Sequence, residues 1–141
     1  MQSAAPQALT EITITLRPPS GEPAQRIRVE DAFTPEARAR GLMFRREVPP
    51  RSGMVFRYQV DNSGGYWMKN TLVPLSIAFF ARNGKVLRIL DMAPCRQEPC
   101  RSYDPGVSYR GALEVNKGFF DHIGLTRGWR VELPADLPPA Q

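Results

Sequence analysis

Residues 75–90 read LSIAFFARNGKVLRIL, two apolar runs joined through the dipeptide Asn83-Gly84. Asn-Gly is the preferred pair for a two-residue type I′ turn, so the stretch predicts a β-hairpin. The register of such a turn places Phe80 opposite Leu87. Both faces of the hairpin are apolar apart from one arginine. We therefore expect it to lie in the centre of a sheet and to be covered on both sides.

Alternating patterns predict further short strands before and after this hairpin. Apolar side chains recur at every second position in residues 9–16, 26–30, 54–60 and 129–133. Residues 112–115 form one more candidate strand. Several short strands with only small helices between them are typical of a β-sandwich or a closed barrel. The sequence thus predicts a mainly β, antiparallel domain.

Two short helices are expected among the strands. Thr34 is followed by a proline and a glutamate, a pattern typical of an N-cap and the first helical turn. The helix should cover residues 35–40 and end at Gly41. Residues 119–123 suit one further helical turn before a glycine. Between these helices, residues 42–44 (Leu-Met-Phe) are expected to anchor in the core.

Length and composition indicate one domain. The chain has 141 residues, 42% of them hydrophobic and 23% charged, which is ordinary for a soluble globular protein. We expect a tail at residues 1–8, a single β-rich domain at 9–133 and a second tail at 134–141. The longest apolar stretch, residues 72–81, is about half the ~20 residues that a spanning helix needs. No transmembrane segment is expected.

The net charge of +5 includes a cluster of arginines in residues 38–51. Such a patch can bind phosphate or nucleic acid, or can simply be a solvated surface. No aromatic-rich RNA motif, zinc-finger spacing or basic helix accompanies it. We therefore expect no nucleic-acid partner.

Cys95 and Cys100 are separated by four residues in a polar loop. A zinc site of four Cys and His ligands is excluded because His122 is the one histidine of the chain. We expect a disulfide rather than a redox dithiol, and no metal or cofactor. A disulfide indicates an oxidising compartment. Residues 1–7, small and polar, are either a simple tail or what remains of a removed signal peptide, and we expect a periplasmic or otherwise exported protein.

Several motifs across residues 27–133 resemble the DUF192 family. They are RGLMFR (40–45), GMVF (53–56), YWMKNT (66–71), NGKV (83–86), MAPC (92–95) and LEV (113–115), with Pro74, Leu75, Cys100, Tyr103, Gly118, Gly124 and Gly128. The resemblance implies a compact, mostly antiparallel β structure of jelly-roll-like type with small helices. Bacterial members often look exported, and the resemblance implies no particular activity. The chain departs from the family at Ser76, where many members carry Asp.

A candidate ligand site follows from one lysine. Lys69 is the single charged side chain between residues 62 and 81, so it must reach water, pair with an acid or help to bind something. Nearby residue types suit recognition: an aromatic face for sugars or cations, an amide, and a guanidinium that can fork onto a carboxylate or phosphate. The candidate ligand-binding residues are Trp67, Lys69, Asn70, Arg45, Asp91 and Tyr103.

Three functions are compatible with these residues. The first is an exported module that binds a small polar or anionic ligand, such as a cell-envelope saccharide. The second is a structural or protein-interaction domain in which residues 66–71 only stabilise the fold, with Trp67 in the core and Lys69 extended to water. The third is an enzyme with Asp91 and Lys69 as an acid–base pair, although no catalytic motif supports one. We favour the first.

Overall fold

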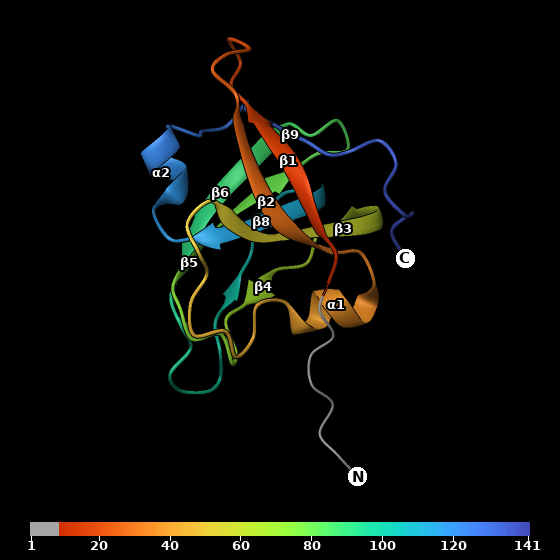
Figure 1. Cartoon of the computed structure of the whole chain (residues 1–141). Helices are drawn as coiled ribbons and strands as arrows, with labels where there is room; N and C mark the ends of the chain where they lie inside the picture. Colours follow the sequence, from red (N-terminus) through yellow and green to blue (C-terminus); the bar gives the residue numbers. More distant parts are fainter. Residues whose placement is uncertain (1–8) are drawn as a thin grey trace.

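A computed structural model describes residues 9–141 as a curled seven-stranded sheet, a two-stranded sheet and two short helices (Figure 1). The elements in chain order are β1 (Glu11–Arg17), β2 (Gln25–Ala32), α1 (Pro35–Arg40), β3 (Ser52–Asn62), β4 (Tyr66–Trp67), β5 (Leu75–Phe80), β6 (Val86–Met92), β7 (Ser102–Tyr103), β8 (Tyr109–Asn116), α2 (Phe119–Ile123) and β9 (Arg130–Glu132). The mainly β prediction is confirmed. The expected tail at residues 1–8 lies outside the described residues.

The large sheet has the strand order β6-β5-β8-β3-β2-β1-β9, and its pairs are antiparallel except for β2 with β3. The sheet curls until its two edges meet at one corner. There the Val86 N–H donates to the Trp129 carbonyl (2.7 Å), and the Val131 N–H donates to the Gly84 carbonyl (2.8 Å). Closure satisfies backbone groups that an open edge would expose. The result is a half-barrel.

Apolar side chains pack on both faces of the central strands. One cluster fills the inside of the curl, with Ile14, Leu16 and Phe120 among its members. The second covers the outer face of β3, β5 and β8 under α1 and the small sheet, with Phe56 and Phe79 at its centre. Every residue of β5 is buried for this reason. The outer layer also forms the candidate site described below.

The hairpin of β5 and β6 differs from its predicted form at the turn. Phe80 pairs with Val86 and not with Leu87 as predicted, because a bulge shifts the register at Leu87, and beyond the bulge Phe79 pairs with Arg88. The turn is a three-residue loop that ends at Gly84, whose φ is 89°. Such a loop replaces the predicted type I′ turn and moves the pairing next to it by one residue, and the bulge at Leu87 restores the predicted register beyond it. β6 is also an edge strand, so only β5 is central and covered on both faces.

Both helices have the bounds that the sequence predicts. The Thr34 hydroxyl accepts a hydrogen bond from the Ala37 N–H (3.1 Å), and the Gly41 N–H donates to the Ala37 carbonyl (2.9 Å). The expectation that Phe44 is a core anchor is wrong, because its backbone turns outward at a φ of 66° and leaves it 56% exposed. No helix within residues 9–141 is long and apolar enough to cross a membrane.

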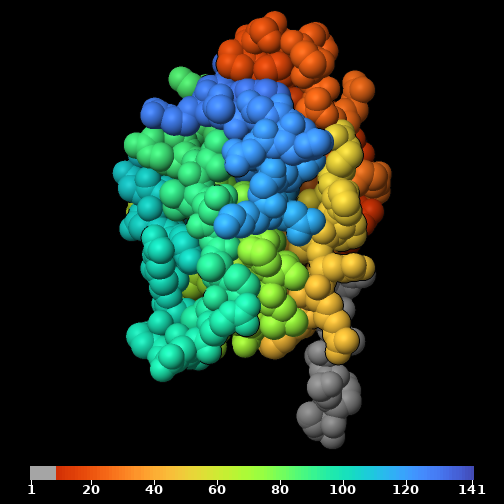
Figure 2. Space-filling model, turned by 90° about the vertical axis from the view of Figure 1, so that its left-hand side faces the viewer, coloured from red at the N-terminus to blue at the C-terminus, as the bar shows by residue number. Residues whose placement is uncertain are grey.

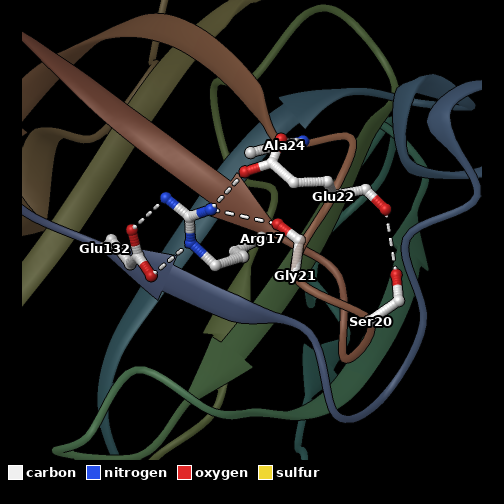
Figure 3. A network of polar contacts seen from close by, with 6 residues as sticks. All are labelled: Arg17, Ser20, Gly21, Glu22, Ala24 and Glu132. Atoms are coloured by element: carbon white, nitrogen blue, oxygen red, sulfur yellow. Dashed lines mark hydrogen bonds and ion pairs between the residues drawn. The ribbon is translucent and has the colours of Figure 1, made fainter.

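Polar contacts of Arg17 and Arg57 tie neighbouring segments of the chain to the sheet. Arg17, at the end of β1, forks onto Glu132 of β9 (2.8 and 3.1 Å) and also holds the following turn through Glu22 (2.9 Å), as Figure 3 shows. This pairing raises the pKa of Arg17 and lowers the pKa of Glu132. The C-terminal residues lie back on the sheet, where Arg57 donates to the Pro138 carbonyl (2.7 Å).

Candidate functional site

A pocket of about 540 Å³ opens between α1 and the small sheet of β4 and β7. These elements lie at one end of the half-barrel (Figure 1). The helix supplies one wall, and its caps fix its position. The opposite wall is the β4–β7 pair, in which Tyr66 faces Tyr103 and Trp67 faces Ser102. The base is formed by residues of β3 and β8 from the large sheet.

The walls are largely aromatic. Phe56, Tyr58, Tyr66 and Trp67 line the pocket. Tyr66 packs edge-on against Phe56, with 5.2 Å between ring centroids, and its hydroxyl lies 2.6 Å from that of Tyr58. Burial raises the pKa of Tyr66. Trp67 is 50% exposed, so part of its ring is free to contact a ligand.

Two arginines of α1 line the same pocket. The Arg38 guanidinium stacks over Tyr58 at 4.7 Å from the ring centroid and donates to the Arg57 carbonyl (2.8 Å). Arg40 lies over Phe44 at 5.8 Å. Because a guanidinium can bind a carboxylate or phosphate through two hydrogen bonds, this wall suits an anionic group.

Glu114 lies at the base of the pocket and is 4% exposed. It stands on β8 between Met54 of β3 and Ile77 of β5, so its immediate neighbours in the sheet are apolar. In the described part of the chain, no hydrogen bond or ion pair to its carboxyl is found. Burial raises the pKa of Glu114 from 4.5 to about 8. The pocket therefore holds a carboxyl that is mostly neutral at pH 7.

Of the six predicted site residues, only Trp67 lines this pocket. Lys69 is paired instead with Glu98 of the disulfide loop, with 3.3 Å between Nζ and Oε2. Its ammonium also lies over the Trp67 ring, 5.3 Å from the centroid. Asn70 is exposed, adopts a φ of 57° and accepts a hydrogen bond from the Phe44 N–H through its carbonyl (2.7 Å).

The other predicted residues have partners elsewhere. Arg45 forks onto the Glu30 carboxylate with two contacts of 2.8 Å, and this bonding raises the pKa of Arg45. Asp91 accepts a hydrogen bond from the Ser76 hydroxyl (2.7 Å). The structure thus brings neither residue into the pocket.

Tyr103 lines a separate recess of about 200 Å³ beside the disulfide loop. Its hydroxyl accepts a hydrogen bond from the Ala93 N–H (3.1 Å), and Arg101 stacks over its ring at 4.5 Å. The predicted disulfide joins Cys95 to Cys100, whose Cα atoms are 5.6 Å apart. Cys100 also lines the pocket of about 540 Å³ beside α1, so the bridge fixes part of the wall of that pocket.

Three segments near the pocket meet on the face that Figure 2 shows. They are the loop at 93–101, the strip at 66–75 and the segment at 40–50.

A larger recess of about 620 Å³ lies at the β5–β6 turn, but the acidic residue that lines it, Asp61, is exposed and paired with Arg110 (3.0 Å). The pocket at Glu114 alone combines an exposed indole with a buried carboxyl that lacks a partner among residues 9–141. Across the same residues, no three His, Cys, Asp or Glu side chains gather to hold a metal ion.

The sequence interpretation missed Glu114, Arg38, Arg40, Tyr58 and Tyr66. A signal for Glu114 was present, since it is the one charged residue in the apolar run 112–115. A strand that is apolar on both faces has no solvated side for an acid. The arginines gave no comparable signal, because solvent-exposed arginines occur throughout this chain.

The fold and the pocket define a half-barrel β domain with a recess beneath its first helix. The chain belongs to the DUF192 family, described as "Uncharacterized ACR", whose model matches residues 16–133. The match confirms the resemblance seen in the sequence motifs. No curated protein matches the chain.

Two solved structures are similar over almost the whole chain. One is a Sinorhizobium meliloti protein described as a "putative transcription regulator", with 30% identity and a TM-score of 0.83, covering 92% of this chain and 98% of that one. The other is a Novosphingobium aromaticivorans protein of unknown function, with 29% identity and a TM-score of 0.79, covering 92% of this chain and 94% of that one.

Proposed function

We propose that this chain is an exported module that binds a small hydroxylated ligand with an anionic group, such as an acidic sugar of the cell envelope. The supporting observation is the pocket of about 540 Å³, which places the exposed indole of Trp67 beside two arginines and above a buried carboxyl. Its size lies within the range of small-molecule sites. The Cys95–Cys100 disulfide supports the exported setting.

Each wall has a role in this proposal. The Trp67 ring provides a flat apolar face on which a sugar ring can stack. Arg40 supplies charge for a carboxylate substituent, since within residues 9–141 the contact found for its guanidinium is the aromatic ring of Phe44. Lys69 and Glu98 act indirectly, because their pairing holds the disulfide loop against the strand that carries Trp67.

The experiment is a titration of the protein with D-glucuronate, D-galacturonate and methyl β-D-glucoside, followed by calorimetry and by thermal shift. We expect the acidic sugars to bind more tightly than the neutral one. Arg40→Ala should weaken acidic-sugar binding by about tenfold or more, as loss of a charge-assisted hydrogen bond does. Trp67→Ala should weaken it by about two- to tenfold.

Arg127→Ala is the matched control, since Arg127 is exposed and follows α2, outside the pocket. It removes the same charge and should leave the affinity unchanged. The proposal fails if none of the sugars binds, or if Arg40→Ala and Arg127→Ala weaken binding equally.

One observation favours the second candidate function, a protein-interaction surface. Phe44, Trp67 and Leu72 are each at least half exposed, and the Phe44 N–H bonds to the strip that carries the other two. Leu72 lines none of the recesses described above. Leu72→Ala therefore separates the two candidates: it should weaken a protein partner but not a sugar.

A further inference from the structure

The contacts of Glu114 do not explain a role for this residue in the stability of the fold. Its neighbours across the sheet, Met54 and Ile77, are apolar and 1% or less exposed. No side-chain polar atom in residues 9–141 is both sealed from solvent and without a partner. Since its carboxyl lacks a hydrogen bond from another described residue, the carboxyl must reach solvent through the pocket that it lines.

In this position the ionised carboxyl carries a large desolvation free energy, whereas the neutral carboxyl carries a much smaller one. Burial raises the pKa of Glu114 to about 8, so at pH 7 the neutral form exceeds the anion by about ten to one. The neutral form offers one O–H donor and retains acceptor capacity, whereas the anion can only accept.

The other ionisable groups that face the pocket come from three elements. They are Arg38 and Arg40 of α1, Tyr58 of β3 and Tyr66 of β4. Arginine and tyrosine side chains, as residue types, change charge at about pH 10 or above. Within β8 itself, Tyr109 packs against Tyr58, and burial raises its pKa. Between pH 6 and 9, Glu114 is therefore the lining group whose charge is expected to change.

We infer that Glu114 is the specificity-determining residue of this pocket and that, as a neutral acid, it donates a hydrogen bond to a ligand hydroxyl, so that binding is linked to proton uptake. The inference rests on the proposed function and specifies it. The pocket then has two polar ends, a cationic wall at α1 and a neutral donor at the base. A sugar acid fits both, because its carboxylate meets the arginines while its hydroxyls reach inward.

The linkage disfavours a class of ligand. An ammonium group at the base pairs best with the Glu114 anion, and forming that anion at pH 7 reduces the apparent affinity by about tenfold relative to a site already ionised. Amino sugars and amines that point inward should therefore bind poorly. A ligand hydroxyl that accepts the hydrogen bond of the neutral acid instead stabilises the protonated form and raises its pKa further.

The test follows the carboxyl carbon of Glu114 by NMR in protein labelled with ¹³C at glutamate carboxyls, from pH 5 to 10. The spectra are recorded without ligand and with saturating D-glucuronate, and Glu114→Gln assigns the signal. In parallel, D-glucuronate affinity is measured at pH 7 and 9. We expect wild-type affinity to fall by about tenfold over this interval, since the neutral fraction falls by that factor.

Glu114→Gln keeps the shape and a donor but cannot ionise, so its D-glucuronate affinity should no longer change between pH 7 and 9. Glu47→Gln, at an exposed glutamate, is the matched control and should keep the wild-type pH dependence. A free-protein titration near pH 4.5 would overturn the inference while leaving glucuronate binding, and hence the proposed function, intact. A carboxyl that titrates near 8 but does not respond to bound glucuronate would also overturn it. Absence of binding by all three sugars would defeat both.

Discussion

Replacing Glu114 by Gln should change how the stability of the fold depends on pH. In the folded chain burial raises the pKa of Glu114 from 4.5 to about 8. Between those two pH values the folded state holds a proton that the unfolded chain has lost. Stability therefore falls as the pH rises through this window, and below it the neutral carboxyl imposes no such penalty.

The size of the effect follows from the same two values. Each pH unit between them corresponds to about 1.36 kcal/mol, so the loss of unfolding free energy from pH 4.5 to 8 amounts to roughly 4–5 kcal/mol. Glutamine does not ionise and should remove this slope. The variant should be close to wild type at pH 5 and more stable by several kcal/mol at pH 9.

Urea unfolding with the disulfide intact, at one-unit steps from pH 5 to 9, measures the difference between wild type and Glu114→Gln. Taking the difference cancels the titration of all other groups, including His122. Glu47→Gln serves as the surface control and should run parallel to wild type. If the Glu114→Gln curve also runs parallel to wild type, the carboxyl is ionised in the folded protein and the reasoning about the pocket is refuted.

Three further substitutions test the fold. Arg57→Met should lower the unfolding free energy measured in urea by about 3–5 kcal/mol. The Asp31 carboxylate, which is 2% exposed, would lose the guanidinium that donates to both of its oxygens at 2.7 and 2.9 Å. A loss below about 1 kcal/mol would contradict this reasoning. Replacing Cys95 and Cys100 together by Ala should cost about 2 kcal/mol, the chain-entropy value for so short a loop, and an unchanged urea midpoint would count against it. Gly53→Ala should cost more than about 2 kcal/mol, because its Cβ would lie 2.0 Å from a β8 carbonyl oxygen, and a wild-type melting temperature would disprove the close contact.

Local signals in the sequence were sufficient for most of the fold. The first helix could be placed because the residues that flank it, Thr34 and Gly41, carry capping chemistry that acts over one turn, and the end of the second was marked by Gly124. Alternation located the strands of the large sheet, as at Ile12 and Ile14, because one face of each is buried. The strands β4 and β7 could not be found, since two residues show no period and their pairing joins segments about 36 positions apart.

The candidate site was predictable only in part. Trp67 was recognised because its residue type suits ligand contact wherever it is exposed. Lys69 was the more obvious candidate, but its partner, Glu98, lies in a loop whose position depends on the disulfide and on the fold as a whole. Arg45 likewise pairs with a carboxylate within the fold, that of Glu30 on β2. Long-range ion pairs of this kind leave no periodic trace in a sequence.

For Glu114, the position in the sequence indicates a functional site, although the residue type alone does not. Because β8 is buried on both faces, an apolar residue is expected at position 114, and an isosteric neutral side chain there would avoid the penalty of ionisation above pH 4.5. Violations of local rules in otherwise consistent sequences tend to lie at functional sites. Here the violation coincides with the base of a pocket, beside an exposed indole and two arginines. A structural role would require a partner for the carboxyl within the fold, and none is found in residues 9–141. The partner is then expected to come from the solvent side, as a ligand whose hydroxyl replaces water at the buried acid.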